Sequence, residues 1–129
     1  MKLKEIAGTY SILRYAPDEK IPDWVYQSGF LSVSRTDEEL SIVCDADAVQ
    51  GAQGTGGAQD REDDWKCLKV QGPLDFSLTG ILSSIASPLA DAKISIFAIS
   101  TFDTDYVMLK SDHLGTAKQT LRTAGFDVV

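Results

Sequence analysis

Residues 94–110 read ISIFAISTFDTDYVMLK, and this stretch decides the fold. Residues 93–100 are almost continuously apolar, which predicts a central strand that is covered on both faces. Residues 101–104 carry the turn-forming sequence TFDT, and residues 105–110 return as a second strand. The stretch therefore predicts a β-hairpin with an acidic turn.

The segment before the hairpin predicts one strand and one helix. Residues 65–70 alternate apolar and polar side chains, as a half-buried strand does. Residues 77–90 predict a helix that either Ser77 or Thr79 can cap, and Pro88 is expected to bend or end it because proline lacks an amide hydrogen. The apolar face of this helix consists of Ile81, Leu82, Ile85 and Leu89.

The segment after the hairpin predicts a second helix and a last strand. Ser111 or Asp112 is expected to cap the helix, and Gly125 stands where a helix-ending glycine belongs. Residues 126–129 predict a short final strand. Residues 65–129 thus have the order β-α-β-β-α-β of a ferredoxin-like unit.

The first half of the chain predicts a shortened copy of the same unit. Residues 8–15, 30–34 and 40–44 predict strands, and residues 21–27 one or two helical turns. The stretch FLSVSRTDEELSIV (30–43) overlays IFAISTFDTDYVML (96–109) at an offset of 66 residues, which places Ser34 on Ser100. Such self-similarity indicates an internal duplication whose first copy is reduced.

A glycine-rich segment separates the two halves. Residues 46–64 read ADAVQGAQGTGGAQDREDD and hold four of the ten glycines, so we interpret them as a flexible linker or a long exposed loop. The charge run at residues 60–64 is interpreted as solvated loop. The expected units are therefore residues 1–64, with this loop, and residues 65–129.

The composition excludes several classes of function. The chain has 129 residues and a net charge of −7, so nucleic acid is not expected as a partner. No apolar run is long enough to span a membrane, and the N-terminus has no signal sequence, which indicates a cytoplasmic protein. Cys44 and Cys67 lie in apolar, strand-like runs and are interpreted as reduced core thiols.

Four stretches resemble a known family: IPDWV (21–25), FLSVSRTDEELSIVC (30–44), TGILSSIASPLA (79–90) and ISIFAISTFDTDYVMLK (94–110). Together with the tail DHLGTAKQTLRTAGF (112–126), they are similar to small bacterial proteins of two ACT-like domains, related to the regulatory domains of aspartate kinases and to the cytosolic arginine sensor. The resemblance implies an α+β fold of two ferredoxin-like (βαββαβ, ACT-type) units packed side by side. It also implies that a free amino acid binds at their interface, without catalysis.

The residues themselves offer matching chemistry for an amino acid. The helix start at residues 77–81 supplies backbone amides for a carboxylate, and Gly80 permits close approach. Asp103 and Asp105 can hold the ammonium group. Apolar walls can come from Phe102, Ile81 and Val33.

The resemblance to the arginine sensor adds contacts around Asp75, Leu78 and Ile81, in the turn with Thr101, Phe102 and Asp105, and at the first-half strand end. That sensor has an acidic residue where this chain has Leu78, which favours a neutral or smaller amino acid here. The expected ligand-binding residues are Ser32, Val33, Ser34, Asp75, Leu78, Thr79, Gly80, Ile81, Thr101, Phe102, Asp103 and Asp105.

Structural roles remain open for the same residues. Asp103 and Asp105 also suit an ordinary turn, Thr79 and Gly80 a helix cap, and Ser32 and Ser34 a solvated strand face. His113 is the only histidine, so no triad, metal set or cofactor site is expected, and we expect no enzyme. The alternative function is a ligand-free structural or oligomerisation module. An exposed sheet edge would favour a homodimer in either case.

Overall fold

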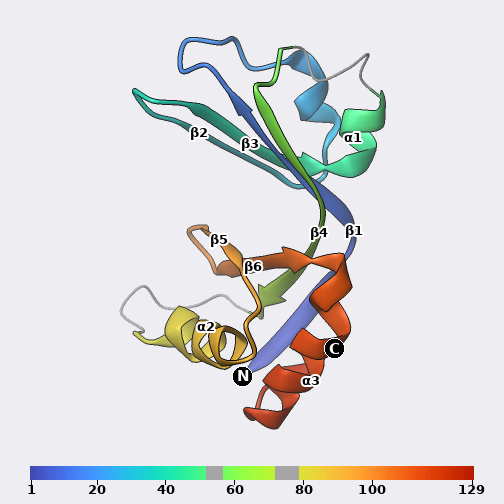
Figure 1. Cartoon of the computed structure of the whole chain (residues 1–129), viewed down its shortest axis with the longest axis vertical. Helices are drawn as coiled ribbons and strands as arrows, with labels where there is room; N and C mark the ends of the chain where they lie inside the picture. The colour runs from blue at the N-terminus through green and yellow to red at the C-terminus, as the bar shows by residue number, and fades with distance from the viewer. Residues whose placement is uncertain (52–56, 72–78) are drawn as a thin grey trace. The chain divides into compact units, whose positions relative to one another are not determined.

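The computed structural model describes residues 1–51, 57–71 and 79–129. It divides into two compact units, Gly8–Trp65 and a second unit made of Met1–Ala7 with Lys66–Val129. Strands β1 (Lys2–Tyr15) and β4 (Asp60–Val70) contribute residues to both units (Figure 1). The first seven residues were expected in the first half, but they group with the second half, where Lys2 and Leu3 pair with β7 (Asp127–Val128).

The described residues of the Gly8–Trp65 unit form four strands and two short helices. After β1 come the 3-10 helix η1 (Asp23–Gln27), β2 (Leu31–Arg35), β3 (Leu40–Asp45) and α1 (Ala46–Gly51), and the strand order is β2-β3-β1-β4. Strand β3 pairs antiparallel with both β1 and β2. Its core contains Leu13, Tyr15, Val25, Leu40, Ile42, Cys44 and Val49.

The interpretation of residues 46–64 as one long loop is wrong at both ends. Residues 46–51 form α1, where Val49 is buried, and residues 60–64 form the first part of β4. The charges in β4 have partners along the strand: Arg14 Nη1 lies 2.9 Å from Asp60 Oδ2, and the Arg61 guanidinium donates to both oxygens of Asp63. A charged run that is exposed but paired suits the strand that lies at the end of this unit's strand order.

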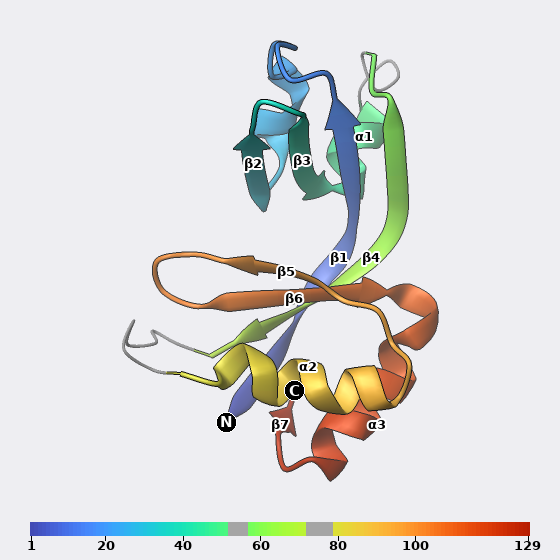
Figure 2. The same cartoon turned by 60° about the vertical axis from the view of Figure 1, so that its left-hand side comes forward.

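The second unit has the strand order β5-β6-β4-β1-β7. It includes α2 (Ile81–Asp91), β5 (Phe97–Ser100), β6 (Asp105–Lys110), the 3-10 helix η2 (Ser111–His113) and α3 (Leu114–Thr123). Helices α2 and α3 lie on the same side of β5 and β6 (Figure 2). The core between helices and strands contains Leu3, Leu68, Val70, Ile85, Leu89, Ile94, Val107, Leu109, Ala117, Leu121 and Val128.

Strand β5 is an edge strand and not the expected central one. Among the described strands it pairs with β6 alone, and it begins only at Phe97. Ala98 and Ser100 on this strand are exposed, whereas Val107, Met108 and Leu109 of β6 are fully buried. The prediction of a strand from the apolar run is therefore confirmed, but β6, and not β5, is the buried strand of the hairpin.

Helix α2 matches the expected apolar face and differs at both ends. Ile85 and Leu89 are buried, and Ile81 and Leu82 pack against the same core. The N-cap is Gly80, with no side-chain cap, so the expected cap by Thr79 is wrong, and Ser77 lies outside the described residues. Pro88 does not end the helix, which continues to Asp91.

Helix α3 ends as the sequence predicts. Gly125 has φ +102°, its amide donates to the carbonyl of Arg122 at 3.0 Å, and the Phe126 amide donates to Leu121 at 3.0 Å. These two bonds form a Schellman motif, in which glycine avoids the steric cost of left-handed backbone. At the other end, η2 precedes α3 and no side chain caps the helix at His113, which is exposed as expected.

The hairpins β2–β3 and β5–β6 have the same geometry at an offset of 65 residues. The last pairs are Arg35–Leu40 and Ser100–Asp105, so positions 35 and 40 correspond to 100 and 105. Both turns close with the same bond, from the Thr36 amide to Glu39 O at 2.9 Å and from the Thr101 amide to Thr104 O at 2.8 Å. The expected offset of 66 is therefore wrong by one residue, a slip that exchanges the two faces of each strand.

No helix within residues 1–51, 57–71 and 79–129 combines the length and apolar character needed to cross a membrane.

Candidate functional site

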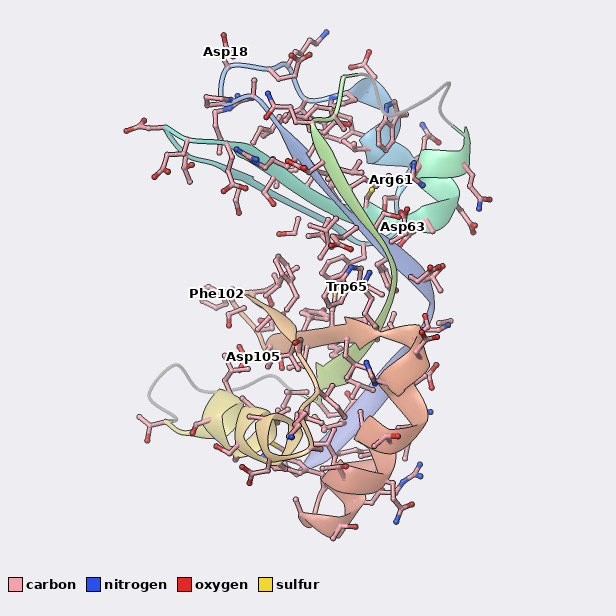
Figure 3. The ribbon with its side chains drawn as sticks, viewed as in Figure 1. Asp18, Arg61, Asp63, Trp65, Phe102 and Asp105 are labelled. Atoms are coloured by element: carbon pink, nitrogen blue, oxygen red, sulfur yellow. The ribbon has the colours of Figure 1, made fainter. Side chains whose placement is uncertain are left out.

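The β5–β6 turn holds four of the predicted site residues in a closed conformation. Besides the amide bond from Thr101 to Thr104, the Thr101 hydroxyl lies 3.1 Å from the Thr104 carbonyl. Asp105 Oδ1 accepts a hydrogen bond of 2.6 Å from the Ser100 hydroxyl, across the last pair of the hairpin. Thr101, Phe102 and Asp103 are exposed, and the Phe102 ring is 80% exposed at the tip (Figure 3).

Thr104 connects this turn to strand β4, a role that was not predicted from the sequence. The residue is only 3% exposed, and its hydroxyl donates to the Val70 carbonyl at 2.5 Å. Val70 is the last residue of β4, directly before the segment that leads to α2. A threonine beside two turn aspartates was the available signal, because threonine hydroxyls commonly bond to backbone near turns.

The pleat of β6 places Asp105 on the side of the sheet that carries α2. Side chains two residues apart share a face, so Asp105 lies on the face of Val107 and Leu109. Those two residues belong to the core that includes Ile85 and Leu89 of α2. The half-buried Asp105 carboxylate is therefore oriented toward the helix layer, at the turn end of the hairpin.

The start of α2 supplies exposed backbone. Gly80 adopts left-handed backbone with φ +76°, and an added Cβ there would meet nothing within 4 Å. Its carbonyl accepts the Ser84 amide at 2.8 Å as the first helical bond. Thr79 and Gly80 are exposed, whereas Ile81 turns toward the core. The next amides of this first turn are donors that a helix leaves unbonded to its own carbonyls.

The other predicted site residues belong neither to the β5–β6 turn nor to the described start of α2. Ser32, Val33 and Ser34 lie on β2 in the Gly8–Trp65 unit, where Ser34 and Val33 are exposed and Ser32 is half-buried. Asp75 and Leu78 lie outside the described residues. Two hollows among the described residues, of about 250 and 260 Å³, involve none of the predicted residues. They are lined by Met1, Ser84, Ala124, Gly125 and Phe126, and by Glu19, Lys20, Ile21, Pro22 and Asp23.

The two cysteines are fully buried free thiols, as the sequence predicts. Burial raises the pKa of Cys44 to about 11, and Asp45 adds to this increase. Burial alone raises the pKa of Cys67 to about 12. Thiols with such pKa values are poor nucleophiles near neutral pH. Within the described part of the chain, no three histidine, cysteine or acidic side chains are grouped as a metal site.

The described elements define an α+β protein with a mostly antiparallel sheet and helices that cross between its strands. A family model described as an ACT domain matches residues 60–123, which include the β5–β6 hairpin and α2. A further model, for an N-terminal domain, matches residues 8–51. The chain belongs to the ACT-domain family.

Relatives of this chain include sensor and regulatory proteins. The human protein named "Cytosolic arginine sensor for mTORC1 subunit 1" is 39% identical over 59 residues, which cover 45% of this chain and 18% of the sensor. The chain therefore spans less than a fifth of that relative's length. The named function of the sensor thus concerns a much longer protein.

Two solved structures are similar over nearly the whole chain. Protein Atu0741 from Agobacterium tumefaciens is 42% identical, with a TM-score of 0.84 over 99% of this chain and 91% of that one. The regulatory subunit of aspartate kinase from Thermus thermophilus has a TM-score of 0.69 at 14% identity, over 97% and 98% of the two chains. The second likeness concerns the fold alone.

Proposed function

We propose that this protein is a non-catalytic sensor that binds a free amino acid between its two ACT-like units, of which the Gly8–Trp65 unit is the reduced one. Family membership supports the regulatory role, since the relatives are named as regulatory subunits or sensors. The observation that carries the proposal is the orientation of Asp105 toward the layer of α2, whose first turn offers backbone amides. A carboxylate and free amides are what the two charged groups of an amino acid require.

The ligand we propose is a neutral amino acid. A carboxylate of the ligand would lie at the amides that follow Gly80, and its ammonium at Asp105. The 80% exposed ring of Phe102 would cover the ligand side chain, with Thr101 and Asp103 beside it. Leu78 supports a neutral ligand, because the resemblance to the arginine sensor implies an acid at this position. Asp75, Thr79, Ile81 and the strand end at Ser32, Val33 and Ser34 complete the proposed site.

A thermal screen of the twenty amino acids tests this function. A ligand that binds only the folded protein raises the melting temperature, by linkage of about 2.7 kcal/mol at one hundred times its Kd. We expect one or a few neutral amino acids to raise it, and arginine to have less effect. Titration calorimetry on each hit then gives its affinity.

Matched variants separate the site from general effects. Asp105→Asn keeps the acceptor for Ser100 and removes the charge, so the shift should disappear. Asp112→Asn changes an exposed acid of η2 and should retain it. If no amino acid raises the melting temperature of the wild-type protein, the alternative function holds, a structural or oligomerisation module without ligand.

We propose a cytoplasmic location in either case. We also propose a homodimer, for which sedimentation is the test.

A further inference from the structure

The Gly8–Trp65 unit has no acid where the other unit carries Asp105, and it carries a cation at the position paired with that one. In the common register of the hairpins, Arg35 takes the place of Ser100, and Leu40 takes the place of Asp105. The Ser100–Asp105 pair therefore has an arginine and a leucine as its counterpart. A ligand ammonium group would find no carboxylate at this position of the Gly8–Trp65 unit.

The Arg35 side chain reaches backbone that corresponds to the approach to α2. Its guanidinium donates to the carbonyl of Pro17 and, through Nη2, to the carbonyl of Glu19 at 2.8 Å. Both carbonyls lie between β1 and η1, the counterpart of the segment between β4 and α2. The guanidinium of Arg35 thus bonds to two carbonyls, those of Pro17 and Glu19, in the segment that leads into η1.

A hollow adjoins these acceptors. Residues 19–23 line a space of about 260 Å³ that includes the carboxylate-bearing residues Glu19 and Asp23. Glu19 is at once a wall of the hollow and the residue whose carbonyl accepts from Arg35. The hollow, which Lys20 also lines, and the guanidinium therefore share Glu19, and the two carbonyl oxygens that Arg35 contacts suit a cationic group.

We infer that Arg35 is a built-in occupant of a second, cation-accepting site at residues 17–23. This inference rests on the proposed function for its consequence, namely that the chain binds one amino acid and not two. The guanidinium holds the counterpart site closed, and its removal opens a place for a small guanidinium or alkylammonium ion. The site differs from the one at Asp105 because its acceptors are mainly backbone carbonyls.

Chemical rescue tests the inference without knowledge of the amino-acid ligand. Arg35→Ala should lower the melting temperature by a few degrees, and millimolar methylguanidinium should restore most of the loss. The control is Arg14→Ala, which removes an exposed arginine paired with Asp60 in the same unit. Methylguanidinium should not restore that variant, because Arg14 bonds a single carboxylate on a strand.

The inference is overturned by an Arg35→Ala protein that methylguanidinium does not stabilise, or by equal rescue of both variants. Arg35→Gln, which keeps an amide donor, replaces Arg35→Ala in the same titration if the alanine variant does not fold. Calorimetry with an amino acid from the thermal screen gives the second arm, with one site expected in wild type. A count of two in wild type would also contradict the closed site, whereas absence of any binding concerns the proposed function alone.

Discussion

At the residue scale, the β5–β6 turn depends on one buried hydroxyl. Thr104 is 3% exposed and donates to the Val70 carbonyl, while its neighbours Thr101, Phe102 and Asp103 are exposed. The buried hydroxyl of Thr104 therefore fixes the turn that carries the candidate ligand-binding groups, although Thr104 is not itself one of them. Such an anchor sets the position of Asp105, the next residue.

Thr104→Val tests this anchor, because it keeps the side-chain shape and removes only the hydroxyl. We expect a loss of about 1 kcal/mol in the free energy of unfolding, since a buried carbonyl loses its partner. Urea unfolding measures the loss. Thr101→Val is the control on the exposed side of the same turn and should cost less. Equal costs for the two variants would contradict an anchoring role for Thr104.

Two glycines, Gly115 within α3 and Gly125 just after its end, separate backbone strain from packing. Gly125 has φ +102° and Gly115 does not have left-handed backbone, yet an added Cβ meets nothing within 4 Å at either position. Gly125→Ala should destabilise by about 1 kcal/mol or more because alanine disfavours left-handed backbone. Gly115→Ala should stabilise by about 0.5 to 1 kcal/mol because alanine favours helix. Urea unfolding of both variants gives the comparison, and changes of the same sign would refute the explanation.

At the element scale, α2 continues past an interior proline. Pro88 provides no amide hydrogen, but the helix runs to Asp91, and the Ala92 amide donates to Pro88 O at 3.1 Å. Buried Leu89 follows directly, so packing against the core retains the last turn that proline weakens. Tertiary contact here overrides the local preference.

Pro88→Ala should therefore stabilise the protein, by about 1 to 3 kcal/mol, because alanine restores the missing helical hydrogen bond. Ser87→Ala, at the exposed preceding position, is the control and should change stability by less than about 0.5 kcal/mol. Circular dichroism during urea unfolding records both. A Pro88→Ala protein that is less stable than wild type would show that the ring itself fills space in the core.

The strands and helices of the second half could be predicted from periodicity, because their buried residues recur at fixed spacings such as Ile85 and Leu89. The edge position of β5 could not, since an apolar run does not reveal how many partners a strand has. The one-residue error in the repeat had a similar origin: the serines at 34 and 100 invited an alignment that only the pairing Arg35–Leu40 corrects. Residues 1–7 group with the second half because they pair with strands that are distant in the sequence, and such long-range pairing has no local sequence signal.

The proposed ligand-binding groups could be chosen from the sequence, but the hydrogen bonds that hold them in place could not. Asp105 and the start of α2 follow from chemistry that an amino acid requires. Neither the bond from Thr104 to Val70 nor the hydroxyl of Ser100 on Asp105 could be inferred from spacing. The bonds of Arg35 could not be inferred either, because its acceptors at Pro17 and Glu19 lie on a different segment.

At the scale of the whole molecule, the two buried thiols link stability to alkaline pH. Folding raises the pKa of Cys44 and of Cys67 above the ordinary value of 9.0, to about 11 and about 12, because burial disfavours the thiolate. The folded state thus retains protons that the unfolded chain releases. This contribution to stability is fully present below pH 9 and is lost as the pH rises toward the folded pKa values.

We therefore expect the free energy of unfolding in urea to decline between about pH 9 and pH 11. A protein with both Cys44→Ala and Cys67→Ala has a lower stability throughout, because it has lost buried side chains, but a smaller decline over the same interval. Tyr15, whose pKa burial also raises, remains in both proteins and accounts for the residual decline. Parallel profiles for the two proteins would refute the assignment to the thiols.

Strands β1 and β4 each serve both compact units, and residues 1–7 fold with the far half of the chain. A single cut in the gene therefore cannot yield two self-sufficient pieces: a fragment starting after residue 64 would lack the strand between β4 and β7. Loss of one unit would remove parts of two strands that the other unit also uses. Because β1 and β4 are shared, we expect the two units to be inherited together.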